Sequence, residues 1–132
     1  MEFSSLVLME KDKETGFMTK ELGSYEVSEG AEYIKKMFYD GERVNIYFDT
    51  NKDVEDWEYS AVFDLFKEDK FRLQGYDIDQ IDDEYNPMWL VKFNYDEEYS
   101  IVLSKINDIC SLIKTNIDEV FEDIKGKEDD YK

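Results

Sequence analysis

The stretch GYDIDQIDDEYNP, residues 75–87, holds five carboxylates in thirteen residues, and carboxylates bind hard cations and basic partners. A calcium loop of the EF-hand type needs oxygen ligands at positions one, three and five, a glycine at six and a glutamate at twelve. Counted from Asp77, the stretch has Asp79 at position three, but Ile81, Asp82 and Met88 stand at positions five, six and twelve. The spacing therefore departs from the standard calcium loop at three places.

A second stretch, DTNKDVEDWEYS, matches the first half of the same loop. Asp49, Asn51 and Asp53 stand at positions one, three and five, but Val54 replaces the glycine and Ser60 replaces the final glutamate. The pattern favours a turn from a strand into a helix, with Asp53 as the helix N-cap. Weak binding of a divalent cation by Asp49, Asn51 and Asp53 is the alternative. We predict no cofactor.

Nucleophilic and zinc-dependent catalysis that relies on histidine is excluded, because the sequence contains no histidine. This removes Ser-His-Asp and Cys-His systems and the HExxH zinc site. Cys110 lies between Ile106 and Ile113 on an apolar helical stripe, which is typical of a buried thiol with a raised pKa. We therefore predict that the chain is not an enzyme. Acid–base chemistry by a pair of carboxylates is the alternative.

The charge of the chain is strongly negative. Thirty-four acids face 16 bases, which gives a net charge of −18, and residues 51–100 alone carry 15 acids and 5 bases. Such a field repels nucleic acids and anionic membranes and attracts basic partners. An aromatic content of 16% predicts a folded chain in spite of the charge.

The compartment is predicted from the N-terminal segment and the cysteine content. The sequence begins MEFSSLVLMEKDKE, with an acid at position 2 and no basic segment before its short apolar run. This pattern is not typical of a signal peptide or a membrane span. A single cysteine suits a reducing environment, so we predict a cytoplasmic protein.

Two hairpins are predicted in the N-terminal third. The first pairs Phe3–Asp12 with Phe17–Val27. The second joins residues 32–39 to residues 42–49 through the two-residue turn Asp40-Gly41. The alternation of the second hairpin places Val44, Ile46 and Phe48 on one face, the core face.

After the hairpins the apolar period changes from two to between three and four, which predicts helices. The expected elements are a helix over residues 53–67, a short helix or loop over residues 68–87, a strand over residues 88–95 and a long helix over residues 96–125, which Gly126 ends. In the short helix or loop, Ile78 and Ile81 would contact the core while the carboxylates face water.

The order ββββ-α-β-α predicts an α+β domain. We expect an antiparallel sheet of about five strands, made of two N-terminal hairpins and one later strand, with two main helices packed on one face. Residues 1–126 form a single domain in this interpretation, and residues 127–132 form a frayed acidic tail.

The sheet face away from the helices is a candidate interface. If Val44, Ile46 and Phe48 face the helices, Tyr47 faces the other way. Tyrosine, methionine and lysine side chains on such a face resemble the core of a protein interface. This face favours a homodimer or another protein contact, and its candidate residues are Tyr33, Met37, Tyr39 and Tyr47.

The stretches LMEKDKETGFMTKELGSYEV and DEYNPMWLVKF are similar to those of a family of small acidic bacterial proteins of the clostridial type without an assigned function. The resemblance extends over most of the chain and includes no catalytic motif. It implies a cytoplasmic bacterial protein of one domain.

The leading hypothesis is a non-enzymatic protein-interaction module that binds a basic protein partner, as an immunity-type inhibitor or an acidic chaperone does. Direct binding of nucleic acid or of a membrane is not expected. The candidate partner-binding residues are Asp77, Asp79, Asp82, Asp83, Glu84, Tyr85 and Trp89. Two alternatives stay open. The first is a nucleic-acid mimic that occupies a DNA- or RNA-binding groove, and the second is a protein that binds a divalent metal through carboxylates.

Overall fold

A computed structural model describes residues 4–12 and 14–131 of the chain. Phe3, the first residue of the first predicted strand, lies outside the described residues. The elements follow one another in the order β1 (Ser4–Lys11), β2 (Met18–Val27), the 3-10 turn η1 (Ala31–Tyr33), β3 (Ile34–Tyr39), β4 (Arg43–Asp49), α1 (Asp56–Leu65), α2 (Asp69–Leu73), β5 (Asp77–Ile81), β6 (Met88–Asn94), α3 (Tyr99–Asp123) and the 3-10 turn η2 (Glu128–Asp130).

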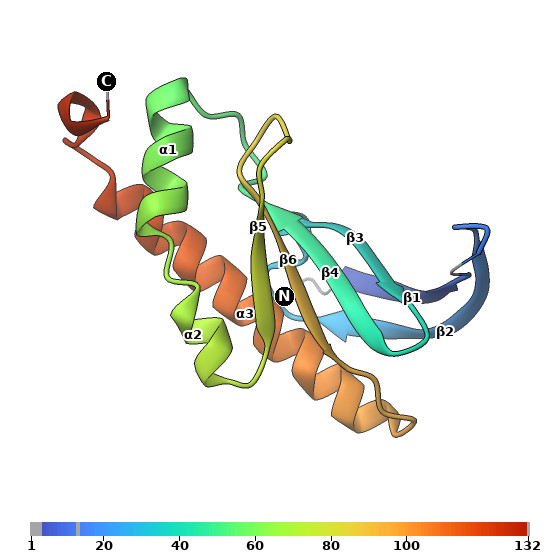
Figure 1. The fold of residues 1–132 in the computed structure, drawn as a ribbon. Coiled ribbons are helices and arrows are strands. Elements are labelled where there is room, and N and C mark those ends of the chain that lie inside the picture. The colour runs from blue at the N-terminus through green and yellow to red at the C-terminus, as the bar shows by residue number, and fades with distance from the viewer. Residues whose placement is uncertain (1–3, 13, 132) are drawn as a thin grey trace.

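The strands form one six-stranded sheet in the order β2-β1-β3-β4-β6-β5. All neighbours pair antiparallel except β1 and β3, which pair parallel where the two hairpins meet. The helices lie together on one face of the sheet, and α3 runs across it (Figure 1). The predicted α+β class is therefore confirmed, with the order ββββ-α-ββ-α and one strand more than expected.

The hydrophobic core lies between the sheet and α3. Val44, Ile46 and Phe48 of β4 are fully buried, as their alternation predicts. Trp89 of β6 lies in the same layer, where its ring stacks on Phe66 with ring centroids 4.3 Å apart. The apolar stripe of α3 and its C-cap residue cover this layer with the buried side chains Val102, Ile106, Ile109, Cys110, Ile113, Ile117, Val120 and Ile124.

The second hairpin turns one residue later than expected. The backbone N–H of Asp40 donates to the carbonyl of Arg43 over 3.1 Å, so Gly41 and Glu42 are the two central residues. Gly41 has a φ of +97°, which its missing Cβ allows at the first central position of a type II′ turn.

The ambiguous segment, residues 68–87, contains a short helix and a strand. Helix α2 ends before Gly75, whose φ is +90°, and β5 then pairs with β6. Ile78 is buried opposite Val91 in the core, whereas Ile81 is half-buried opposite Met88. The expectation that both isoleucines contact the core from a helix or loop was wrong for Ile81. Successive side chains of a strand point to opposite faces, so Ile78 and Ile81, three residues apart, cannot both face the core.

Two helix ends differ from the prediction. The N-cap of α1 is Glu55 rather than Asp53, and the Glu58 carboxylate accepts a hydrogen bond of 2.9 Å from the Glu55 backbone N–H. After α3, the expected tail folds back as η2, and the Tyr131 hydroxyl donates to the Asp64 carboxylate over 2.6 Å. Lys132 lies outside the described residues. None of the helices in residues 4–12 and 14–131 is long and apolar enough to cross a membrane.

Candidate interaction surface

The loop between β5 and β6 carries three consecutive acids, Asp82, Asp83 and Glu84, and α1 holds this loop in place. The Tyr59 hydroxyl lies 2.7 Å from the carbonyl oxygen of Asp82, to which it donates, and 3.1 Å from that of Glu84. The Tyr59 ring packs edge-on against Phe63, with centroids 5.1 Å apart. Because the loop backbone is bound by a packed side chain, its carboxylates extend from a fixed support.

The segment before α1 lies beside this loop at one end of the molecule (Figure 1). The Asn86 amide donates to the Asp53 carboxylate over 3.4 Å and joins the two segments. Residues 53–58 contribute four carboxylates, residues 82–84 contribute three, and neither segment contains a base. We call this set the acidic apex, and its members are Asp53, Glu55, Asp56, Glu58, Asp82, Asp83 and Glu84.

The negative field of the apex acts on Tyr59. The pKa of its hydroxyl is raised above the ordinary value of 10.0, first by burial and then by the charges of Asp82, Asp83 and Glu84. The hydroxyl therefore keeps its proton, and its hydrogen bond to the loop, throughout the physiological pH range.

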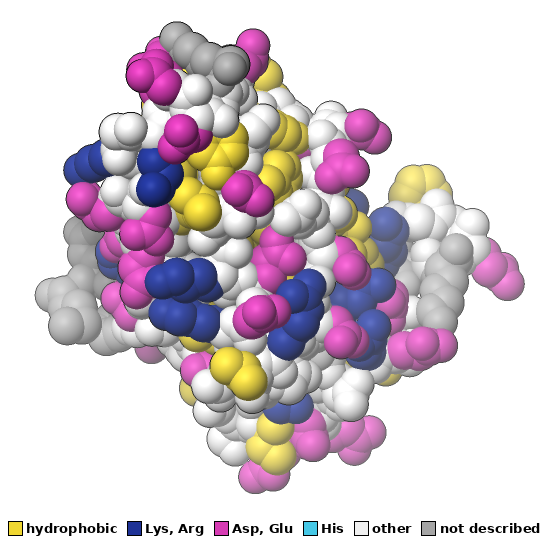
Figure 2. All heavy atoms as spheres, turned by 60° about the vertical axis from the view of Figure 1, so that its left-hand side comes forward, with side chains coloured by type: hydrophobic (Ala, Val, Ile, Leu, Met, Phe, Trp, Pro, Cys, Tyr) yellow, Lys and Arg dark blue, Asp and Glu magenta, His cyan; other side chains and the backbone are white. Residues whose placement is uncertain are grey.

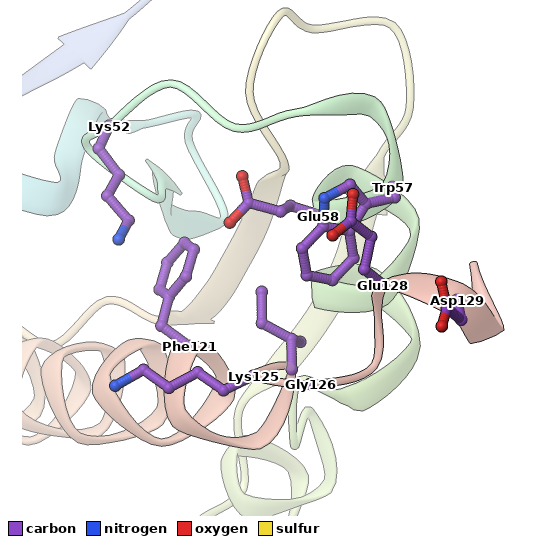
Figure 3. A pocket seen from close by; sticks show the side chains of 9 residues that line it. Lys52, Trp57, Glu58, Phe121, Lys125, Gly126, Glu128 and Asp129 are labelled. Carbon is purple, nitrogen blue, oxygen red and sulfur yellow. The ribbon is translucent and has the colours of Figure 1, made fainter. Parts of the chain in front are cut away.

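A hollow of about 490 Å³ opens between α1 and the end of α3, next to the apex (Figure 3). Its apolar wall consists of Trp57, Phe121 and Ile124. The Trp57 indole N–H donates to the Glu55 carboxylate over 2.8 Å, which connects the hollow to the apex. The charged residues around it are Lys52, Glu58, Lys125, Glu128 and Asp129.

Lys52 extends over the Phe121 ring, and its ammonium nitrogen lies 3.7 Å from the ring centroid. In Figure 3 the Glu58 side chain points toward the same space from α1. Figure 2 shows the helical face of the molecule, where hydrophobic side chains gather near the top and are surrounded by acidic and basic side chains. The hollow thus combines aromatic surface with carboxylates, which suits the binding of a cationic group.

The predicted cation ligands do not converge on one point. The Lys35 ammonium donates to the Asn51 side-chain oxygen over 2.8 Å and lies 3.6 Å from the Asp49 carboxylate. Asp53 instead accepts the hydrogen bond from Asn86. A lysine ammonium thus occupies the position between Asp49 and Asn51. In the described part of the chain, no group of three or more acidic or cysteine side chains is arranged to hold a metal ion.

The predicted partner-binding residues separate into three groups. Asp82, Asp83 and Glu84 lie in the apex loop, and Tyr85 beside them is 77% exposed. Asp77 and Asp79 are exposed on the face of β5 away from the core, where Asp77 forms an ion pair with Arg43.

Trp89 has no exposed surface, so its inclusion as a partner-binding residue was wrong. The alternation of β6 places it in the core, where its indole N–H donates to the Glu68 carboxylate over 3.3 Å.

The four predicted interface residues do not share a face. Met37 pairs with Ile46 and is buried in the core, and Tyr39 and Tyr33 pack against that core. Tyr47 alone of the four faces away from the helices, and it lies against Phe38 with ring centroids 6.2 Å apart. The expected common face was wrong because Met37 and Tyr39, two residues apart in β3, both point toward the core, whereas Tyr33 precedes that strand. A dimer contact through Tyr47 stays a prediction.

Cys110 is fully buried on α3. Burial, and then the charge of Glu32, raises the pKa of the thiol from 9.0 to about 12. The sulfur therefore carries no thiolate near neutral pH, and the interpretation of Cys110 as a core residue is confirmed.

Lys52, Tyr59 and Phe121 were not predicted as site residues. Trp57 and Phe121 are apolar residues at helical spacing, which predicts burial, yet both are only partly buried and line the hollow. The contact of Tyr59 with the acidic loop joins residues far apart in the sequence, and no local pattern indicates it.

The comparisons with known proteins give one match. A family model described as "Family of unknown function (DUF6762)" matches residues 1–132, which confirms the resemblance to a family without an assigned function. No curated protein and no solved structure matches the chain.

Proposed function

We propose that the chain, which belongs to the family of unknown function DUF6762, is a non-enzymatic module that binds a basic protein partner through the acidic apex. The observation that carries the proposal is the attachment of the apex loop to α1. Tyr59 binds the backbone at Asp82 and Glu84, so the loop backbone needs little further ordering when a partner binds. Binding costs less when the contacting groups are already ordered.

Charge complementarity specifies the partner. Seven carboxylates lie in two adjoining segments that contain no base, and the whole chain carries −18. Such a surface accelerates encounter with basic proteins and repels acidic ones, including other copies of this chain. A single cysteine forms no disulfide within the chain, which suits a reducing compartment, so we propose that this binding occurs in the cytoplasm. Within this class, an inhibitor of a basic toxin and a chaperone for a basic protein both fit.

The test is a pull-down from the native cell lysate in about 0.1 M and about 1 M salt, between which the screening length falls from about 10 Å to about 3 Å. We expect a basic protein to be captured at low salt and lost at high salt. The substitutions Asp82→Asn, Asp83→Asn and Glu84→Gln together should abolish capture.

A matched control removes three charges at the other end of the sheet through Glu10→Gln, Glu14→Gln and Glu21→Gln in the first hairpin. This variant has the same net charge as the apex variant and should keep its partner. Equal loss in both variants would show that only the net charge matters and would refute a specific apex site. Displacement of the captured protein by DNA would instead favour nucleic-acid mimicry.

A further inference from the structure

A second hollow, of about 300 Å³, adjoins the first, and Lys52 and Phe121 line both. Tyr33, Thr50 and Ile117 contribute to its wall, with the carboxylates of Asp118 and Glu122 beside them. The two hollows adjoin at Lys52 and Phe121 along the C-terminal half of α3, and we call them together the α1–α3 groove. Its residues are Tyr33, Thr50, Lys52, Trp57, Glu58, Ile117, Asp118, Phe121, Glu122, Ile124, Lys125, Gly126, Glu128 and Asp129.

Lys52 divides the groove at its centre. Its backbone is fixed, because the Thr50 hydroxyl donates to the Lys52 carbonyl over 2.8 Å and the preceding Asn51 has a left-handed φ of +54°. Its side chain is exposed, and its ammonium lies over the face of Phe121. A lysine side chain has a flexible four-carbon stem, so the ammonium can leave the ring without movement of the backbone.

The charge of the groove favours a cation over an anion. Five carboxylates line it, against the two ammonium groups of Lys52 and Lys125. Lys125 is paired with Glu122 over 2.7 Å and Lys114 with Asp118 over 3.0 Å, and with Lys114 counted the five carboxylates still outnumber the three ammonium groups. The faces of Trp57 and Phe121 carry the negative side of their quadrupoles, which attracts cations and guanidinium groups in particular.

We propose that the α1–α3 groove binds an arginine or lysine side chain of a basic partner protein. While no partner is bound, the Lys52 ammonium covers the face of the Phe121 ring. The inference rests on the proposed function, since the apex next to the groove would bind the rest of the same basic segment. Lys52 acts as an internal competitor for the ring, which the partner's side chain displaces.

The two tryptophans of the chain provide a direct readout, since Trp57 lines the groove and Trp89 lies in the core. The ¹⁵N-labelled chain would be titrated with the peptide acetyl-Gly-Arg-Leu-Arg-Gly-amide, and the two indole N–H signals followed by NMR. A twin peptide with citrulline in place of arginine keeps the shape and the planar end group, replaces one nitrogen group by a carbonyl oxygen and removes the charge. We expect a saturable shift of the Trp57 signal with the arginine peptide alone, while Trp89 stays unchanged.

Three variants test the competition. Lys52→Ala frees the ring and should tighten binding about two- to five-fold, the range that an exposed cation–π pair supports. Lys125→Ala removes an equal charge from the same groove without freeing the ring, so its gain should be clearly smaller. Phe121→Leu keeps an apolar side chain and should lose most of the binding. An unshifted Trp89 signal verifies that each variant is folded.

Several outcomes would overturn the inference. If Lys52→Ala and Lys125→Ala increase the affinity for the arginine peptide equally, the effect is general electrostatics and the competition by Lys52 is refuted. If the citrulline peptide binds as tightly as the arginine peptide, the groove does not recognise a cation. A Trp57 signal that does not move, while capture of a basic protein still depends on Asp82, Asp83 and Glu84, would refute the groove and leave the proposed function standing. Failure of both experiments would refute both proposals.

Discussion

The close approach of Gly30, the residue before η1, to the backbone of α3 makes this glycine a sensitive position for a test of the fold. Gly30 has a φ of +86°, and a Cβ built on it would lie 2.2 Å from the carbonyl oxygen of Cys110 and 2.9 Å from its carbonyl carbon. Both are backbone atoms in the middle of a long helix, so neither can rotate away. Carbon and oxygen ordinarily approach to about 3.3 Å. The Gly30→Ala variant must therefore move the segment before β3 away from α3 by about 1 Å.

Two free-energy terms add in this variant. An alanine with left-handed backbone costs about 1–2 kcal/mol relative to glycine. Overpacking against a fixed backbone costs about 1–3 kcal/mol more. We therefore expect the free energy of unfolding to fall by about 2–5 kcal/mol, a large part of the roughly 5–15 kcal/mol of a typical domain.

Gly75 and Gly126 supply the matched controls. Both have positive φ, +90° and +79°, and a Cβ on either would meet nothing within 4 Å. Gly75→Ala and Gly126→Ala therefore carry the backbone cost without the clash.

The assay is urea unfolding followed by far-UV circular dichroism. At an m-value of about 2 kcal/mol/M, an excess loss of about 2 kcal/mol lowers the midpoint by about 1 M relative to the controls. If the free energies of unfolding of Gly30→Ala and Gly75→Ala differ by less than about 0.5 kcal/mol, then Gly30 does not approach α3 as closely as described, and the reasoning is refuted.

Three further predictions concern the buried groups. Cys110 should react with iodoacetamide only as fast as the chain unfolds, and labelling of the folded protein on a faster timescale would contradict its burial. Because the pKa of Cys110 is raised from 9.0 to about 12 in the folded chain, its contribution to stability is complete below pH 9 and is lost as the pH rises toward 12. Urea midpoints measured from pH 8 to 11 should therefore fall above pH 9. Glu68→Ala removes the acceptor of the Trp89 indole N–H and should cost about 1–3 kcal/mol in urea unfolding. Glu119→Ala, which removes exposed ion pairs to lysines, should cost less than about 1 kcal/mol, and equal losses would contradict the role of Glu68.

The architecture follows from local patterns because those patterns are long and unambiguous. Seven buried apolar side chains, from Val102 to the C-cap residue Ile124, recur every three or four residues along α3, and the second hairpin alternates on both sides of a glycine turn. Strand β5 escaped prediction because it has five residues and just one of them, Ile78, is buried. An edge strand of this kind shows the alternation over too short a range to be separated from one turn of helix.

The candidate site was predicted only in part, for a different physical reason. Carboxylates are visible in a sequence, so the loop acids Asp82, Asp83 and Glu84 were found. The support of the loop by Tyr59, 23 residues before Asp82, depends on the packing of α1 against the β5–β6 hairpin. The groove depends likewise on Lys52 and Phe121, which are far apart in the chain and meet only in the folded molecule. Contacts between distant residues leave no spacing to recognise.

The edges of the sheet bear on how a partner reaches this chain. An edge strand offers unpaired backbone groups to any other strand, and many proteins bind partners by adding one. Along β2, the Tyr99 hydroxyl and the Asn107 amide donate to the carbonyls of Ser24 and Glu26. Along β5, the Arg72 guanidinium donates to the carbonyl of Ile78 over 3.2 Å.

Side chains thus bind the carbonyls of Ser24 and Glu26 at one edge of the sheet and the carbonyl of Ile78 at the other. Binding of a partner by addition of a strand is therefore disfavoured at these positions, which favours recognition through side chains. The acidic apex and the α1–α3 groove meet at the first turn of α1, where Trp57 donates to Glu55. A basic segment that bridges them would gain long-range attraction from the apex and a short-range contact from the groove. Salt should therefore slow its association more than it speeds its dissociation.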